Sequence, residues 1–98
     1  MILRVYRAVV HEGQEAAFRA FFEETAIPTL NATDGMERLI VGWPRPEDPQ
    51  AFSMVQIWRD LDAMKAFTGE AWREAVVHPD EAHLLKETSV HHYNVESA

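Results

Sequence analysis

The chain has 98 residues, enough for one domain with one hydrophobic core. Hydrophobic residues make up 47% of it, so the chain has enough apolar surface to fold. Lys and Arg number 9 against 16 Asp and Glu, for a formal net charge of −7. Because phosphates and anionic lipids attract basic surfaces, neither nucleic acid nor a membrane is an expected partner.

The absence of cysteine excludes disulfides, thiolate nucleophiles and cysteine-based metal sites. Arg4 and Arg7 interrupt the apolar run at the N-terminus, which is unlike a signal peptide or a membrane span. We therefore expect a cytoplasmic protein whose residues 1–98 form a single domain.

Residues 2–10 are rich in β-branched side chains and predict a first strand. After a turn, Phe18, Phe21 and Phe22 have the spacing of an amphipathic helix. Pro28 is expected to kink or end this helix because it lacks a backbone N–H, and Gly35 can take the positive φ of a helix stop. Residues 36–43 predict a second strand.

Three prolines in residues 44–49 indicate a stiff connection rather than a strand. Residues 51–58 resume the alternation of a third strand, and Asp60 or Asp62 can cap the helix that follows.

The apolar stripe of this second helix extends from Leu61 to Ala75, with Gly69 as a point where it can break in two. Pro79 is expected at the first position of a short extra helix that runs through residues 84–85. Residues 89–95 predict the last strand.

The order β-α-β-β-α-β predicts an α+β, ferredoxin-like fold with a four-stranded antiparallel sheet and both helices on one face. The strands carry aliphatic residues on both faces, although helices can cover only one. A bare apolar sheet face marks an interface, so we expect a homodimer in which a second copy covers it.

Even-numbered positions of three predicted strands combine polar and aromatic groups: Arg4, Tyr6, Gln56, Trp58, His92 and Asn94. If this face meets the helices, it also meets Phe67 and Trp72 and can line an apolar pocket with a few polar groups, as is typical of small-molecule sites. The alternatives are a closed aromatic core and a wet dimer interface.

In such a pocket, His92 or His78 could act as a general base and Arg4 could stabilise an oxyanion. The histidines also raise the question of a metal site formed by His78, Asp80, His83 and one of the strand histidines, His91 or His92. Their spacing does not place two ligands on one helix face, so surface histidines are the favoured interpretation and no metal is predicted.

Several strings span nearly the whole chain: residues 5–7 leading to Glu12-Gly13, Thr33-Asp34-Gly35-Met36, residues 55–58 running into residues 62–67, and Val90-His91-His92-Tyr93. In order and spacing they resemble the antibiotic biosynthesis monooxygenase family of dimeric α+β-barrel proteins. The resemblance implies a homodimer whose sheets form a barrel, with a pocket in each subunit between sheet and helices.

The family's heme-degrading members use an Asn, a Trp and a His where this chain has Tyr6, Phe67 and Val77, so the resemblance does not imply heme degradation. Members that oxidise aromatic polyketides without a cofactor share the Trp at position 58. Their flanking Asn and Tyr are replaced by Met54 and Met64.

The resemblance and the even-numbered face together predict a cofactor-independent monooxygenase acting on a small aromatic or quinone-like molecule. Candidate catalytic residues are His92, Tyr6 and Trp58. Candidate substrate-binding residues are Arg4, Gln56, Phe67, Trp72, His78 and Asn94. A non-catalytic ligand-binding or stress-related dimer is the alternative, and heme binding through His78 or His92 is a third interpretation. Whether the protein is an enzyme stays open at this point.

Overall fold

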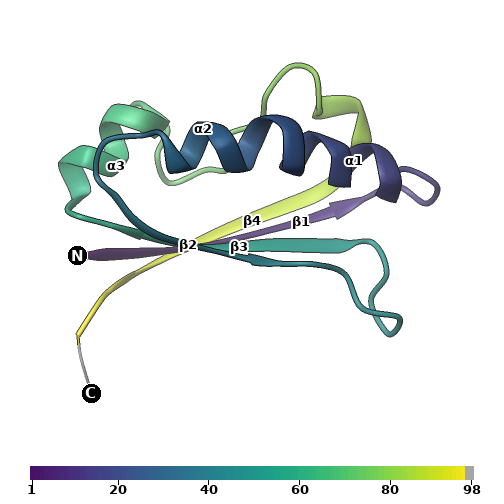
Figure 1. Cartoon of the computed structure of the whole chain (residues 1–98), viewed down its shortest axis with the longest axis horizontal. Coiled ribbons are helices and arrows are strands. Elements are labelled where there is room, and N and C mark those ends of the chain that lie inside the picture. Colours follow the sequence, from purple (N-terminus) through teal and green to yellow (C-terminus); the bar gives the residue numbers. More distant parts are fainter. Residues whose placement is uncertain (97–98) are drawn as a thin grey trace.

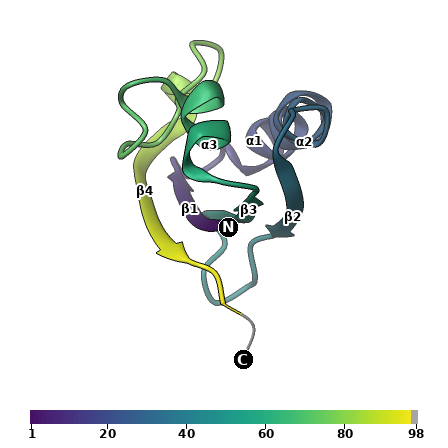
Figure 2. The same ribbon diagram turned by 90° about the vertical axis from the view of Figure 1, so that its left-hand side faces the viewer.

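A computed structural model describes residues 1–96 as an antiparallel sheet with one layer of helices (Figures 1 and 2). The elements are β1 (Ile2–Val10), α1 (Glu15–Phe21), the π-helical turn η1 (Phe22–Ala26), α2 (Ile27–Asn31), β2 (Met36–Gly42), β3 (Ala51–Trp58), α3 (Leu61–Thr68), the 3-10 turn η2 (Ala82–Leu84) and β4 (Leu85–Asn94). The strand order is β2-β3-β1-β4. The predicted α+β, ferredoxin-like fold is confirmed. Within residues 1–96, no helix is long and apolar enough to cross a membrane.

The even-numbered residues of β1 and β3 face the helices, as their alternation predicted. In β3 every even position is buried and every odd position is only partly buried. The register pairs Arg4 with Gln56 and Tyr6 with Met54 across the two central strands. These four side chains therefore lie side by side under the helical layer.

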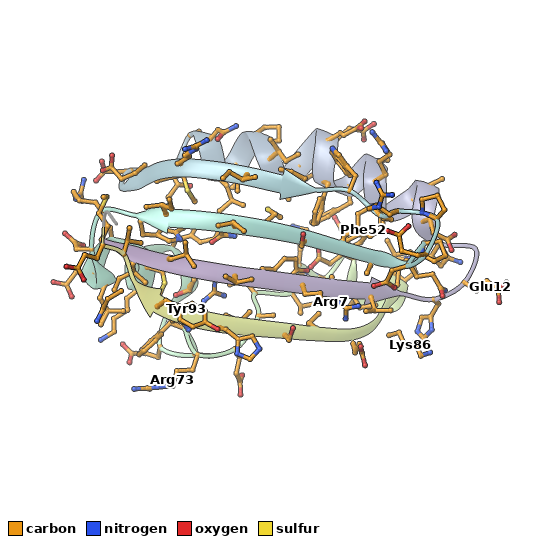
Figure 3. All side chains as sticks on the ribbon, turned by 90° about the horizontal axis from the view of Figure 1, so that it is seen from below. Arg7, Glu12, Phe52, Arg73, Lys86 and Tyr93 are labelled. Carbon is orange, nitrogen blue, oxygen red and sulfur yellow. The ribbon has the colours of Figure 1, made fainter. Side chains whose placement is uncertain are left out.

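The opposite face of the sheet carries no helix (Figure 3). Its centre is aliphatic, since Val5 pairs with Val55 and Leu3 with Ile57. Exposure rises on the outer strands, where Ile40 is 43% exposed. An apolar patch thus lies at the centre of the sheet on its uncovered side.

An aromatic cluster anchors the first helix to the sheet. The ring of Phe18 lies 4.8 Å from that of Phe22 and 4.9 Å from that of Phe52 on β3, centroid to centroid. All three side chains are almost fully buried. The phenylalanine stripe in the sequence therefore fixes which face of α1 packs on the sheet.

The expected interruption at Pro28 takes the form of a π-helical turn. The N–H of Ile27 donates to the carbonyl oxygen of Phe22, five residues back, and Pro28 follows in the first turn of α2. Proline lacks a backbone N–H, and its ring crowds the carbonyl group four residues earlier. The wider π-helical turn accommodates both the missing hydrogen bond and the ring. The helix therefore continues past Pro28 to Asn31.

The region after α3 differs from the prediction. Gly69 has a φ of +83° and ends α3 at Thr68, so the expected helical stripe as far as Ala75 was wrong. Pro79 does not open a helix, because only the short turn η2 forms after it. β4 also begins at Leu85, four residues before the predicted start. Residues 69–80 instead form an irregular connection above the sheet (Figure 1).

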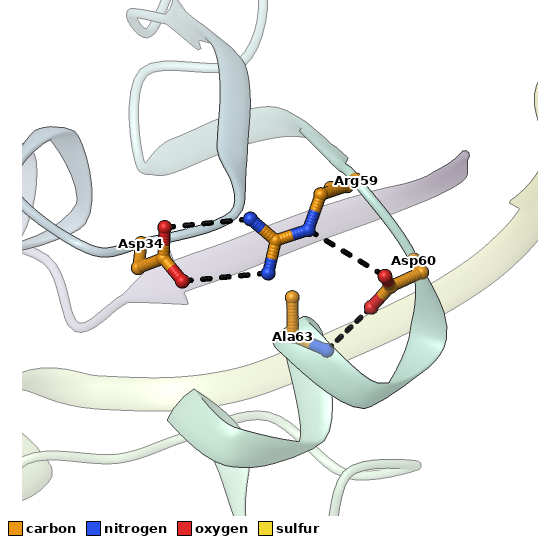
Figure 4. Close-up of polar contacts among 4 residues, drawn as sticks. All are labelled: Asp34, Arg59, Asp60 and Ala63. Atoms are coloured by element: carbon orange, nitrogen blue, oxygen red, sulfur yellow. Dashed lines mark hydrogen bonds and ion pairs between the residues drawn. The ribbon is translucent and has the colours of Figure 1, made fainter.

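Ion pairs fasten the turn before β2 to the start of α3 (Figure 4). The two Nη atoms of Arg59 lie 3.3 and 3.4 Å from the carboxylate oxygens of Asp34. Asp60 caps α3 by accepting a 2.7 Å hydrogen bond from the N–H of Ala63. This bond lowers the pKa of the Asp60 carboxyl, and the prediction that Asp60 or Asp62 caps the helix is confirmed for Asp60.

Candidate functional site

A cavity of about 240 Å³ lies between the sheet and the helices, and we call it the central cavity. Its walls come from β1, β3, the first helix, α3 and the connection that follows α3. The lining residues are Arg4, Tyr6, Phe21, Phe22, Thr25, Ala26, Thr29, Leu30, Met54, Gln56, Phe67, Val76, His78 and Glu81. Ligand pockets usually measure about 300–1,000 Å³, so this one suits a small molecule.

Arg4 brings a buried positive charge to the cavity wall. Its guanidinium donates to the carbonyl oxygens of Trp72, at 2.7 Å, and Glu74, at 3.0 Å. The side chain is 3% exposed, and none of the ion pairs found among residues 1–96 joins it to a carboxylate. Burial lowers the pKa of the Arg4 guanidinium, which nevertheless stays charged. The cavity therefore favours a ligand with an anionic or electron-rich group.

His92 supports Arg4 from outside the cavity lining. Its Nε2 lies 2.8 Å from an Nη atom of Arg4. Since arginine can only donate, Nε2 must accept and the imidazole proton sits on Nδ1. Burial, followed by the Arg4 charge, lowers the pKa of His92 and keeps the ring neutral. A base role through Nε2 would require this bond to break, and the predicted catalytic role of His92 stays a prediction.

Gln56, Trp58 and Phe67 form a connected part of the wall. The indole N–H of Trp58 donates to Oε1 of Gln56 at 3.0 Å, and the Trp58 and Phe67 rings stack with centroids 5.6 Å apart. Gln56 and Phe67 line the cavity, whereas Trp58 is fully buried behind them. Trp58 thus fixes the orientation of the Gln56 amide without lining the cavity itself.

Tyr6 and Glu81 are the buried acids of the central cavity. Burial, followed by the charge of Glu81, raises the pKa of the Tyr6 hydroxyl, so Tyr6 stays protonated and able to donate. Glu81 is 3% exposed, and burial raises the pKa of its carboxyl to about 7, with the backbone of His78 partly opposing the shift. The cavity therefore contains a carboxyl group that titrates near neutral pH.

His78 lines the cavity near its solvent-exposed side. Its Nδ1 accepts a 3.1 Å hydrogen bond from the backbone N–H of Asp80, and its ring lies 5.7 Å from that of Phe21. Neither His83 nor either histidine of β4 lines the cavity. Among residues 1–96, no group of three or more His, Asp and Glu side chains could hold a metal ion.

Trp72 and Asn94 lie outside the central cavity. The carbonyl of Trp72 receives the Arg4 hydrogen bond, while its ring meets His92 edge-on at 5.3 Å between centroids. Asn94 is exposed at the end of β4, opposite Ile2. Of the predicted site residues, the cavity wall therefore combines Arg4, Tyr6, Gln56, Phe67 and His78.

Glu81 and most of the apolar lining were not among the residues predicted from the sequence. In the sequence, Glu81 follows Pro79-Asp80 at the start of the predicted short helix, where an acidic side chain is ordinarily exposed. Its one distinguishing signal is the apolar pair Leu84-Leu85 just after it, of which Leu84 is buried. Thr25 and Thr29 continue the helical spacing of the phenylalanine stripe, but their side chains gave no sign that this part of the stripe lines a cavity.

We expect the free energy of unfolding to fall as Glu81 ionises. The folded protein keeps the Glu81 proton up to about pH 7, whereas the unfolded chain releases it near the ordinary value of 4.5. Relative to Glu81→Gln, the wild type should therefore lose stability as pH rises from 4.5 to 7 and change little above that, by no more than about 3 kcal/mol in total. Urea unfolding at a fixed protein concentration measures this difference, and parallel curves for the two proteins would contradict it.

Comparisons with known proteins place this architecture in one family. The sequence profile described as antibiotic biosynthesis monooxygenase matches residues 1–79. A comparison with curated proteins found no match.

Solved structures share the fold over nearly the whole chain. A candidate antibiotic biosynthesis monooxygenase from Deinococcus radiodurans is 19% identical, with a TM-score of 0.79 over 100% of this chain and 95% of that one. A candidate from Bordetella bronchiseptica is 25% identical, with a TM-score of 0.71 over 98% and 97% of the two chains. SnoaB, a cofactor-independent oxygenase from Streptomyces nogalater, is 22% identical, with a TM-score of 0.70 over 99% and 94%. Because the family profile covers most of its length, this chain belongs to the antibiotic biosynthesis monooxygenase family.

Proposed function

We propose that the protein is a cofactor-independent monooxygenase that oxidises a small aromatic or quinone-like molecule in the central cavity. The observation that carries this proposal is a largely apolar, aromatic-lined cavity with the buried cation of Arg4 in its wall, which forms no ion pair with any carboxylate of residues 1–96. Aromatic walls suit a flat substrate, and a cation in a low-dielectric site stabilises a substrate anion. SnoaB, which shares the fold, is itself a cofactor-independent oxygenase.

The reaction needs only the substrate and dioxygen. A CH₂ group between aromatic rings loses one proton, and the resulting carbanion is delocalised onto a substrate oxygen. The carbanion gives its electrons to dioxygen, a C–O bond forms, and the product is a hydroperoxide. Loss of water then leaves a carbonyl group, so one oxygen atom enters the product and the other leaves as water with both CH₂ hydrogens.

Side chains in the cavity wall and behind it have separate roles in stabilising this anion. Arg4 supplies the positive charge, and Tyr6, which stays protonated, supplies a hydrogen-bond donor two residues along the same strand face. His92 holds Arg4 in place through Nε2. Trp58 fixes the Gln56 amide through the indole N–H. These contacts leave the anion-binding groups preoriented before substrate arrives.

A non-catalytic ligand-binding protein is the second candidate. It is favoured by the position of Trp58, which lies behind Gln56 rather than at the cavity surface. It differs from the first candidate in one respect: an aromatic ligand would bind without consuming oxygen.

Oxygen uptake with a panel of anthrone-type and hydroquinone compounds tests the proposal. The measurement compares the wild type with a variant whose cavity is partly filled and with a matched surface variant. Ala26 lines the central cavity, whereas Ala16 is exposed on the same helix and lies outside the lining. Ala26→Leu should lower kcat/KM for uptake at least tenfold because the added methyl groups occupy substrate space, and Ala16→Leu should leave it unchanged. Binding without uptake would favour the second candidate, and equal uptake by both variants would place the site elsewhere.

We also propose that the protein is a cytoplasmic homodimer in which a second copy covers the helix-free face of the sheet. The support is the aliphatic centre of that face, where Leu3, Val5, Val55 and Ile57 lie together. Arg7 on the same face is already paired with Asp48, at 2.9 Å, and Glu87, at 3.5 Å, so its charge is partly balanced before association. Removing these aliphatic side chains from water is favourable. In a two-fold dimer the same surface patch of each copy forms the interface, so one apolar patch on the chain is sufficient.

Sedimentation equilibrium at micromolar concentration tests the dimer. Val55→Glu places a charge at the centre of the sheet face and should shift the protein to monomer or unfold it. Val77→Glu is the matched control, because Val77 is 42% exposed on the connection after α3, and this variant should stay dimeric. A folded wild-type monomer, or a dimer that tolerates Val55→Glu, would contradict the assignment.

A further inference from the structure

Glu81 occupies an unusual position for an acidic side chain. It is 3% exposed and lines the central cavity just before the short turn η2. Buried carboxylates are normally paired with a cation, yet none of the ion pairs within residues 1–96 involves Glu81. The fold therefore carries the cost of a buried acid without the usual compensation.

The surroundings of Glu81 orient it toward the cavity. The N–H of Glu81 donates to the carbonyl oxygen of His78 at 3.0 Å, and the Glu81 side chain is part of the cavity lining. The titratable groups nearby are His78 on the same connection and Tyr6 on β1, and the first helix contributes only aromatic and neutral side chains to the lining. The wall thus holds one carboxyl group that can accept a proton from a bound molecule.

Arg4 lies on the same cavity wall as Tyr6, and within residues 1–96 no ion pair joins it to an acidic side chain. Tyr6 is influenced electrostatically by both groups, since Glu81 raises the pKa of its hydroxyl and Arg4 opposes that shift. A carboxylate and a guanidinium thus lie around Tyr6 without forming an ion pair with each other. A ligand that transfers a proton to the Glu81 carboxylate becomes an anion, and the Arg4 guanidinium can then stabilise its negative charge.

We propose that Glu81 is the general base of the central cavity and that it removes the acidic C–H proton of a substrate whose anion is then stabilised by Arg4. This inference rests on the proposed function and adds the residue that starts the reaction. The C–H bond breaks, its electron pair stays on the substrate as a delocalised carbanion, and the proton forms an O–H bond with the Glu81 carboxylate. A carboxyl group whose pKa is close to the working pH is well matched to this task.

The decisive experiment follows proton removal without oxygen. Under nitrogen in D₂O, the intact wild-type protein should accelerate hydrogen–deuterium exchange at the CH₂ group of anthrone, followed by mass spectrometry. Glu81→Gln should reduce this acceleration by about 10²-fold or more, because the amide cannot accept the proton. Glu70→Gln, which changes an exposed acid on the same connection, should exchange at the wild-type rate.

The pH profile separates a base from a structural role. Wild-type exchange should rise with pH and level off above about pH 7, following ionisation of Glu81. Glu81→Asp keeps a carboxylate and should retain a reduced rate with the same shape of profile, and it serves as the second variant if Glu81→Gln does not fold. A wild type that fails to accelerate exchange, or a folded Glu81→Gln that exchanges at the wild-type rate, would overturn the assignment.

Oxygen uptake distinguishes this inference from the proposed function. If Glu81-dependent exchange occurs but oxygen is not consumed, the base assignment stands and the oxygenase function fails. If oxygen is consumed equally by wild type and Glu81→Gln, the oxygenase function stands and the base assignment fails.

Discussion

The buried guanidinium of Arg4 is the constraint on which the rest of the site depends. A charged group this far from water is costly unless its donors are satisfied, and the fold satisfies them with two backbone carbonyls and one imidazole nitrogen. Both carbonyls belong to the irregular connection after α3, at Trp72 and Glu74. Arg4 therefore ties that connection to the centre of the sheet, and in doing so it holds the wall that contributes Val76, His78 and Glu81 to the cavity.

The same buried surroundings also set the charge states of the polar groups in and around the cavity wall. Arg4 occupies the Nε2 lone pair of His92 and keeps that ring neutral, while Tyr6 stays protonated in the same low-dielectric surroundings. Burial raises the pKa of the Glu81 carboxyl to about 7, so this group can change charge near neutral pH. Together with Arg4, it gives an otherwise aromatic cavity the two features that stabilising a substrate anion requires: a proton acceptor and a fixed positive charge.

Much of the fold could be predicted from strand periodicity, because β1 and β3 each alternate two different kinds of side chain. That parity correctly placed Arg4, Tyr6, Gln56 and Trp58 under the helices. It could not distinguish the cavity surface from the layer behind it, which is why Trp58 was expected to contact substrate. Such a distinction depends on the 5.6 Å stacking with Phe67, a contact between elements that no local pattern encodes.

The segment after Gly69 shows where local patterns fail. Its apolar residues continue the helical spacing of α3, but one residue at positive φ redirects the chain, and tertiary contacts to Arg4 then decide its path. Glu81 was missed for the same reason: the sequence around it predicted the start of a short helix, and its burial follows only from how the connection folds back over the sheet.

The central claim is that a flat aromatic molecule binds between sheet and helices with its electron-rich oxygen at Arg4. Crystals of the protein soaked with a brominated hydroquinone test it directly, because anomalous scattering locates the bromine independently of any assumed pose. We expect a single strong peak in the central cavity, among the side chains of Phe22, Met54 and Phe67, with a ligand oxygen within hydrogen-bonding distance of Arg4 or Tyr6. A peak on the helix-free face of the sheet, or an empty cavity at saturating ligand, would contradict it.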